Sequence, residues 1–203
     1  MVRGSLVLRL ALLNIPVLAL VQPAFAHEQV GVAGGLASGM LHPLTGIDHM
    51  MAMVAVGIWG AQLGTPAIWL LPVTFPLVMA FGGVVGVLRI PLPMPEVVIA
   101  LSAVVLGTAV AVRARVPLVV AAAVVAVFAI FHGHAHGVEL PDAANPLAYG
   151  AGFVIATGLL HLCGITIGAL SRWPAGERLI QGLGVAIAAL GGYFLAFSLG
   201  ALA

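Results

Sequence analysis

The stretch HPLTGIDH, residues 42–49, places two histidines and an aspartate within an otherwise apolar segment. On an uninterrupted α-helix His42 and His49 would share one face but lie about 10 Å apart along the axis, too far to share an ion. Pro43 lacks a backbone N–H and clashes with the preceding turn, and Gly46 tolerates unusual dihedral angles. The stretch therefore predicts a helix that is kinked or unwound between the two histidines.

Three side chains of this stretch are candidate ligands for an ion: His42, Asp48 and His49. Unwinding would bring them toward one point and add free carbonyl groups there. Irregular backbone at membrane depth is tolerated only where it is buried in protein or lines a wet cavity, and burying one ionised group costs at least about 2.5 kcal/mol. The alternative is structural, with Asp48 as a hydrogen-bonded carboxyl group that ties its helix to a neighbour.

The composition defines the class of protein. Of 203 residues, 63% are hydrophobic and 6% are charged, and the mean hydropathy is +1.23. A spanning helix needs roughly 20 apolar residues, so the chain is predicted to be an all-α membrane protein, a bundle of about six transmembrane helices. All seven basic residues are arginine, which excludes a retinal Schiff base and argues against binding to nucleic acid. The single cysteine, Cys163, excludes an internal disulfide.

The N-terminus has the pattern of a targeting segment. Two arginines flank the start of an apolar run, and the triplet Ala24-Phe25-Ala26 follows it. This pattern predicts a signal peptide, residues 1–26, that is cleaved to leave a permease domain of residues 27–203. The alternative is an uncleaved transmembrane helix.

The remaining apolar segments predict six spans and their orientation. Proline, glycine or charge separates them, and they cover residues 30–61, 66–88, 96–112, 117–138, 146–170 and 178–201. With the mature N-terminus outside, four arginines would lie in cytoplasmic connections and one, Arg89, in an outer connection. This distribution obeys the positive-inside rule and supports an orientation with the mature N-terminus outside the cytoplasm.

A second polar motif, FHGHAHGVE at residues 131–139, ends the fourth span. His132 and His136 are four residues apart and Glu139 follows three later, so the three side chains form a stripe on one helix face. His134 points roughly the other way. The stripe predicts nitrogen and oxygen ligands for a metal ion; the alternative is a hydrated, histidine-rich helix end at the headgroups.

Four further residues are weaker candidates as ligands. His161 lies mid-span, where a histidine is equally well explained by a hydrogen bond between helices. Glu96 opens the third span, where it suits the helix dipole or a cation entrance. His27 would become the mature N-terminus and offer an amine beside its imidazole. Cys163 is more often a small apolar residue than a ligand.

Imidazole and carboxylate ligands suit divalent ions such as nickel, cobalt and zinc. Ligands spread over several spans, with acids at the outer face, predict a permease that carries such an ion inward, with no enzymatic activity and no prosthetic group. The strongest alternative is an intramembrane zinc hydrolase, since histidines and an aspartate can also activate water. A histidine-ligated haem carrier is a second alternative.

HPLTGIDH and FHGHAHGVE resemble the two signatures of the HupE/UreJ family of bacterial nickel permeases, which accompany the nickel enzymes hydrogenase and urease. The resemblance implies Ni²⁺ as the transported substrate and the inner membrane of a bacterium as the location, with the mature N-terminus in the periplasm. The family pattern leaves the position of His134 variable. The resemblance implies ligand roles for six residues: His42, Asp48, His49, His132, His136 and Glu139. Selectivity against cobalt and zinc, energy coupling, the recipient enzyme and assembly into a homo-oligomer stay open.

The proposed order of events has two sites. The ion would be attracted by acidic groups, exchange water for His132 and His136, and then reach His42, Asp48 and His49 deeper in the bundle. Each site would bind the ion strongly enough to strip water and weakly enough to release it.

Overall fold

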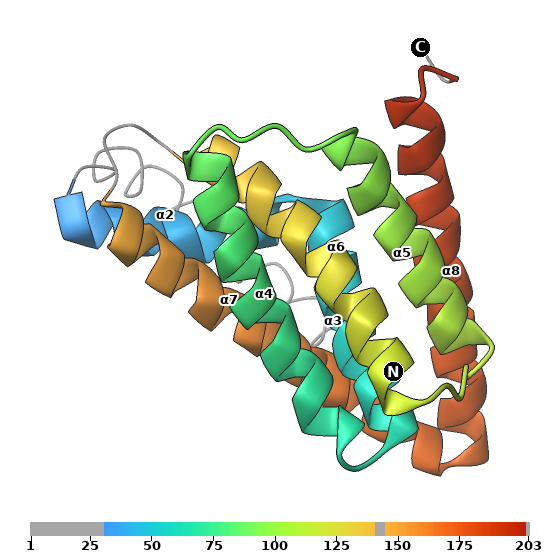
Figure 1. The fold of residues 1–203 in the computed structure, drawn as a ribbon. Helices are drawn as coiled ribbons and strands as arrows, with labels where there is room; N and C mark the ends of the chain where they lie inside the picture. The colour runs from blue at the N-terminus through green and yellow to red at the C-terminus, as the bar shows by residue number, and fades with distance from the viewer. Residues whose placement is uncertain (1–30, 141–144, 202–203) are drawn as a thin grey trace, which may run out of the picture.

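The computed structural model describes residues 31–140 and 145–201. Within these ranges the chain forms seven α-helices, one 3-10 turn and no strand, which confirms the all-α prediction for this part of the chain. The elements, labelled as in Figure 1, are α2 (Gly31–Thr45), α3 (Ile47–Leu63), α4 (Ala67–Val87), α5 (Pro95–Ala111), α6 (Leu118–Val138), α7 (Pro146–Gly168), η2 (Ala169–Arg172) and α8 (Pro174–Ser198). The signal peptide at 1–26 and His27 lie outside the described residues and stay predictions.

Four elements are long and apolar enough to cross a membrane: α4, α6, α7 with its 3-10 extension, and α8. The pair α2 and α3 makes a fifth span if it is counted as one, and α5 is apolar but has only 17 residues. The protein is therefore a multi-pass membrane protein by the length and composition of its helices. The count of six spans stays a prediction.

The chain bends by 83° between α2 and α3, inside the HPLTGIDH stretch. Gly46 sits at the bend with φ −86° and ψ 106°, an extended conformation, and is the N-cap of α3. The Thr45 hydroxyl donates to the His42 carbonyl oxygen at 2.8 Å, so it satisfies one carbonyl group that the end of α2 leaves free. The two helices thus diverge at the point where the sequence offers a glycine for the turn.

Glycines bring the helices into close contact. The main neighbours are α4 with α6, α5 with α8, and α7 with both α2 and α3. A Cβ atom at Gly133 of α6 would overlap the Met79 carbonyl oxygen of α4, and one at Gly39 of α2 would overlap Tyr149 of α7. Small residues at helix crossings allow such approach in lipid, where packing drives association. Gly182 and Gly192 of α8, by contrast, have no atom within 4 Å of an added Cβ.

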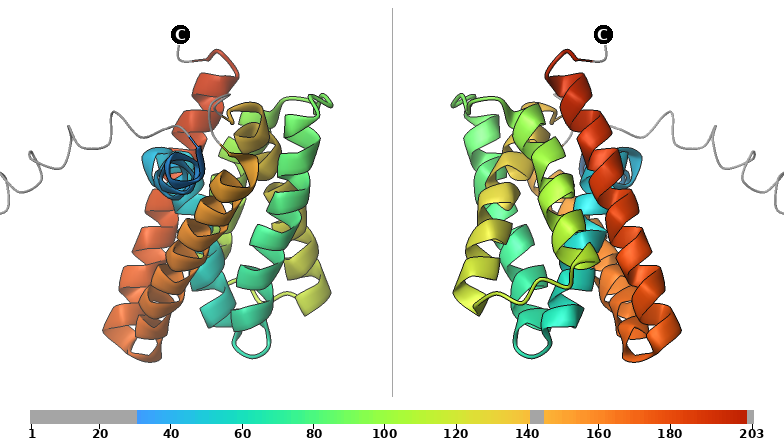
Figure 2. Two further views of the ribbon diagram at one scale, coloured as in Figure 1. Left: turned by 90° about the vertical axis from the view of Figure 1, so that its left-hand side faces the viewer. Right: turned by 90° about the vertical axis from the view of Figure 1, so that its right-hand side faces the viewer.

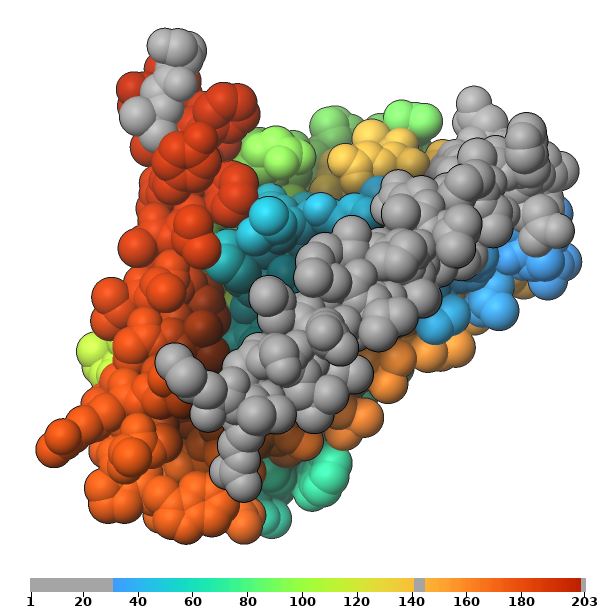
Figure 3. Space-filling view, turned by 180° about the vertical axis from the view of Figure 1, so that it is seen from behind, coloured from blue at the N-terminus to red at the C-terminus, as the bar shows by residue number. Residues whose placement is uncertain are grey.

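The bundle has two distinct ends. The α4–α5 connection, the end of α6 and the start of α7 lie at one end, and the α3–α4, α5–α6 and α7–α8 connections lie at the other (Figures 1 and 2). Seen from behind, α8 stands along one edge of the molecule and α2 lies toward the opposite side (Figure 3). Arg89 belongs to the first end. Four arginines belong to the second: Arg113, Arg115, Arg172 and Arg178.

Candidate metal site

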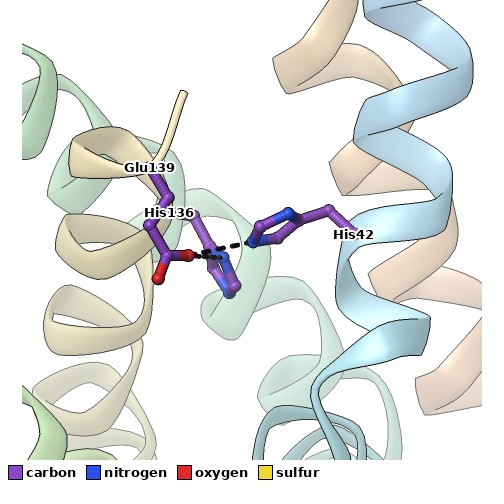
Figure 4. Close-up of side chains that lie close together, drawn as sticks. All are labelled: His42, His136 and Glu139. Atoms are coloured by element: carbon purple, nitrogen blue, oxygen red, sulfur yellow. Dashed lines mark hydrogen bonds and ion pairs between the residues drawn. The ribbon is translucent and has the colours of Figure 1, made fainter. Parts of the chain in front are cut away.

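Three side chains from the two histidine-rich motifs converge between α2 and the end of α6 (Figure 4). Nε2 of His42 lies 3.1 Å from Oε2 of Glu139, and Nδ1 of His136 lies 3.8 Å from the same oxygen. Each of these residues offers one ligand atom, and the three atoms lie within 4.8 Å of one another. Two nitrogens and one carboxylate oxygen at this spacing fit the ligand chemistry of a borderline divalent metal ion.

Local structure explains how α6 presents its part of this site. His136 is in the last turn of α6, and Glu139 follows as its C-cap, with its backbone N–H bonded to the carbonyl of Ala135. The spacing of three residues places both side chains on the same face of the helix. His42 reaches them from the last turn of α2, which the bend at Gly46 sets across the end of α6.

Two further histidines extend the site inward. The imidazole centroid of His49 lies 4.4 Å from that of His136 and 4.9 Å from that of His132. The His42 and His136 centroids are 4.7 Å apart. All six principal ligand candidates of the sequence therefore form one connected group, termed the histidine cluster: His42, Asp48, His49, His132, His136 and Glu139.

Hydrogen bonds fix the tautomers of the two inner histidines. Nδ1 of His132 lies 2.9 Å from the Phe128 carbonyl oxygen, which can only accept, so this nitrogen carries the proton. Nδ1 of His49 likewise donates to Oδ1 of Asp48 at 2.9 Å. Each Nε2 atom then holds a lone pair, is buried, and has no hydrogen-bond partner among the described residues. An imidazole held this way by its other nitrogen is the usual arrangement of a metal-ligating histidine.

Exposure decreases along the histidine cluster. The exposed fraction of the side chain is 53% for Glu139, 30% for His42, 12% for His49 and 6% for His136, and His132 is fully buried. The cluster thus opens at the end of α6 and closes toward the bundle interior. A cation entering from this end would meet Glu139 and His42 first.

Glu139 supplies the negative charge at this opening. The hydrogen bond from His42 lowers the pKa of the Glu139 carboxyl group, although partial burial acts in the opposite direction. The group is therefore anionic at neutral pH, which suits the attraction of a hydrated cation.

Aromatic side chains line the cluster, and the sequence did not single them out. Phe153 lies 4.3 Å from His136 and Tyr149 lies 5.9 Å from His42, both measured between ring centroids, and both come from α7. Phe75 of α4 lies 5.4 Å from His132. Apolar residues are common throughout a spanning helix, so their types carry no signal that separates a lining position from a lipid-facing one.

The weaker candidates lie apart from the three-ligand group. Nε2 of His134 donates to the Ile90 carbonyl oxygen at 2.8 Å, on a different side of α6. Glu96 is exposed in the first turn of α5, and Cys163 is exposed on α7. His161 is buried in α7 against Phe75.

The expected order of an outer and a deeper site is wrong. His136 contacts both His42 and His49, and His132, expected in the outer site, is the most buried histidine of the cluster. The bend at Gly46 is the physical reason, because it carries α2 back over the end of α6.

Membrane-length apolar helices that enclose a histidine and carboxylate cluster at one end define a multi-pass membrane protein with a candidate metal-ion site. The chain matches the family model described as HupE / UreJ protein over residues 15–194. It is 46% identical over 178 residues to Protein HupE of Rhizobium leguminosarum bv. viciae. This alignment covers 87% of this chain and 93% of that relative. No solved structure matches the chain. The chain belongs to the HupE/UreJ family.

Proposed function

We propose that the protein is an inner-membrane permease that imports Ni²⁺, with Co²⁺ as the next substrate, and supplies a nickel enzyme such as hydrogenase or urease. The observation that carries the proposal is the convergence of His42, His136 and Glu139 within 4.8 Å. The six residues of the histidine cluster act as ligands or hold ligands in place.

The geometry supports a role for each part of the cluster. Glu139 and His42 meet the hydrated ion at the opening and replace part of its water. His136 then shares the ion with the Nε2 atoms of His49 and His132, whose lone pairs have no protein partner among the described residues. Asp48 holds the His49 ring through Nδ1. Several nearby ligands of this kind allow the ion to move by exchanging one ligand at a time.

The charge distribution supports the direction of transport. Four arginines lie at the end of the bundle opposite the histidine cluster, and one lies at the cluster end. By the positive-inside rule the arginine-rich end faces the cytoplasm, so the cluster opens to the periplasm. An ion that enters at Glu139 then moves inward.

The zinc hydrolase alternative has less support. Such an enzyme retains its metal and keeps a coordination position open for the substrate. The family match lends that activity no support. A permease must release the ion, so the two alternatives differ in whether the metal crosses the membrane.

The test is Ni²⁺ flux into liposomes that contain the purified protein and enclose a Ni²⁺-sensitive dye. The permease predicts a dye response that rises with protein density and is lost in His136→Ala. Tight binding of one equivalent of metal with no flux, in protein of verified orientation, would contradict the proposal. Glu177→Gln, at the opposite end of the bundle, is the control.

A further inference from the structure

A row of buried side chains runs along one face of α7 from the histidine cluster into the bundle. Tyr149, Phe153, Thr157 and His161 follow one another at intervals of four residues, and their exposed fractions are all 5% or less. Tyr149 and Phe153 contact histidines of the cluster. Each interval advances about 6 Å along the helix, and α7 runs from the cluster end to η2 at the arginine-rich end (Figure 1), so Thr157 and His161 lie successively farther from the cluster.

Thr157 and His161 are polar groups without ordinary hydrogen bonds. Oγ1 of Thr157 and both ring nitrogens of His161 are buried and make no bond of normal geometry to a described residue. The hydroxyl groups of Ser102 and Thr166, by contrast, each donate to the carbonyl oxygen three residues earlier. A buried polar group without a partner costs roughly 1–3 kcal/mol, so this pair calls for a function.

The His161 ring is linked to the histidine cluster through one aromatic side chain. Phe75 contacts His161 edge-on, with centroids 5.4 Å apart, and contacts His132 at the same distance. His132 is the innermost histidine of the cluster. The next imidazole inward is thus separated from it by the width of one phenylalanine ring.

A carbonyl group without its helical donor lies on the neighbouring helix α4. Pro76 has no N–H to donate to the Pro72 carbonyl group, the partner it would have in a regular helix. This carbonyl group lies near the His161 ring, but the two form no hydrogen bond. In a neutral imidazole only one ring nitrogen carries a proton, so the other ring nitrogen of His161 holds a lone pair for a ligand.

We propose that His161 and Thr157 form a second, weaker cation station, which receives the transported ion after the histidine cluster and before its release at the arginine-rich end. One imidazole and one hydroxyl group bind a divalent ion less tightly than the cluster does. A weaker station further along the path lets the ion leave the tighter one, which conduction requires. The inference rests on the proposed permease function.

The competing explanation is structural, with His161 serving only to satisfy the Pro72 carbonyl group. His161→Gln and His161→Asn separate the two explanations. Between them they keep an amide N–H at the position of either ring nitrogen, and both remove the imidazole ligand. Cys163→Ala, an exposed position on the same helix, is the matched control.

Two quantities are measured for each variant: Ni²⁺ uptake by cells at equal membrane abundance, and Ni²⁺ affinity of the purified protein by calorimetry. The second station predicts uptake at least tenfold lower in both His161 variants, with cluster affinity within twofold of wild type and no change in Cys163→Ala. Full uptake in either His161 variant would overturn the station and leave the proposed function standing. Absence of uptake by wild type would overturn both.

Thr157→Val provides a second test that preserves side-chain shape. The station predicts at least a threefold loss of uptake, again with unchanged affinity of the histidine cluster. If neither His161 variant reaches the membrane, Thr157→Val provides the test. Reduced Ni²⁺ uptake by Thr157→Val supports the station, and uptake equal to wild type overturns it.

Discussion

Nε2 of His42 lies 3.1 Å from Oε2 of Glu139, although 97 positions separate the two residues in the chain. The contact joins the two polar motifs into one site. It depends on the 83° bend between α2 and α3, which sets α2 across the end of α6. The proposed ligand set therefore depends on backbone geometry at Gly46 as much as on the identity of the ligands.

Glu139→Gln tests the anionic ligand at the opening of the site. Glutamine keeps an acceptor oxygen but loses the charge that attracts a cation, so the dissociation constant for Ni²⁺ is expected to rise at least tenfold, about 1.4 kcal/mol. Calorimetry on purified protein measures it. Glu177→Gln, which removes a carboxylate paired with Arg113 at the other end, is the control and should leave the affinity unchanged. Equal affinities for the two variants would exclude Glu139 as a ligand.

Gly46→Ala tests the bend. A Cβ atom at this position would lie 3.1 Å from Nδ1 of His49 and 3.3 Å from Oδ1 of Asp48, so the ring and carboxylate must shift. Alanine also favours continuation of the helix. We expect Ni²⁺ uptake to fall several-fold at unchanged abundance. Gly182→Ala, which meets no atom within 4 Å, is the matched control. Wild-type uptake by Gly46→Ala would show that the geometry of the bend is not needed.

Asp48→Asn separates charge from hydrogen bonding at the inner part of the cluster. Asp48 accepts hydrogen bonds from the backbone N–H and from Nδ1 of His49, both at 2.9 Å. Asparagine keeps an acceptor oxygen and should hold the ring in place with less electrostatic support. Ni²⁺ uptake is expected to lie between wild type and Asp48→Ala. If Asp48→Asn is as inactive as Asp48→Ala, the carboxylate binds the ion directly rather than positioning His49.

Gly133→Ala tests the packing of α4 against α6 without changing any candidate ligand. The added methyl group would overlap the Met79 carbonyl oxygen and lie 2.8 Å from the Gly83 nitrogen, so α4 and α6 must separate. Overpacking of this kind costs about 1–3 kcal/mol, and the midpoint of thermal unfolding in detergent should fall. Gly158→Ala, with no atom within 4 Å, should leave the midpoint unchanged. A midpoint equal to that of wild type would show that the two helices tolerate a wider separation.

Much of the helical layout could be predicted from the sequence. Apolar segments bounded by proline, glycine and charge placed the helices to within a few residues, because both the hydrophobic requirement and the helix breakers act locally. The shared face of His132, His136 and Glu139 followed from helical periodicity for the same reason. His134 was expected on a different side of α6, and its bond to Ile90 agrees with this.

The assembly of the site could not be predicted. Whether His42 meets Glu139 depends on how far α2 swings at Gly46 and on the glycine contacts that seat α2 against α7, and neither is encoded by local spacing. For that reason the two motifs were expected to form successive sites. Tyr149, Phe153 and Phe75 were missed because their contacts to histidine are set by helix packing.

The proposed transport of nickel through the histidine cluster is open to a direct test. The measurement is radiolabelled Ni²⁺ uptake in cells that lack their own nickel importers, with wild type, His42→Ala and Asp48→Ala compared at equal membrane abundance. We expect uptake by wild type and its loss in both variants, and competition by Co²⁺ and Zn²⁺ then measures the selectivity. No uptake of any of these three ions by correctly inserted wild-type protein would contradict the proposal.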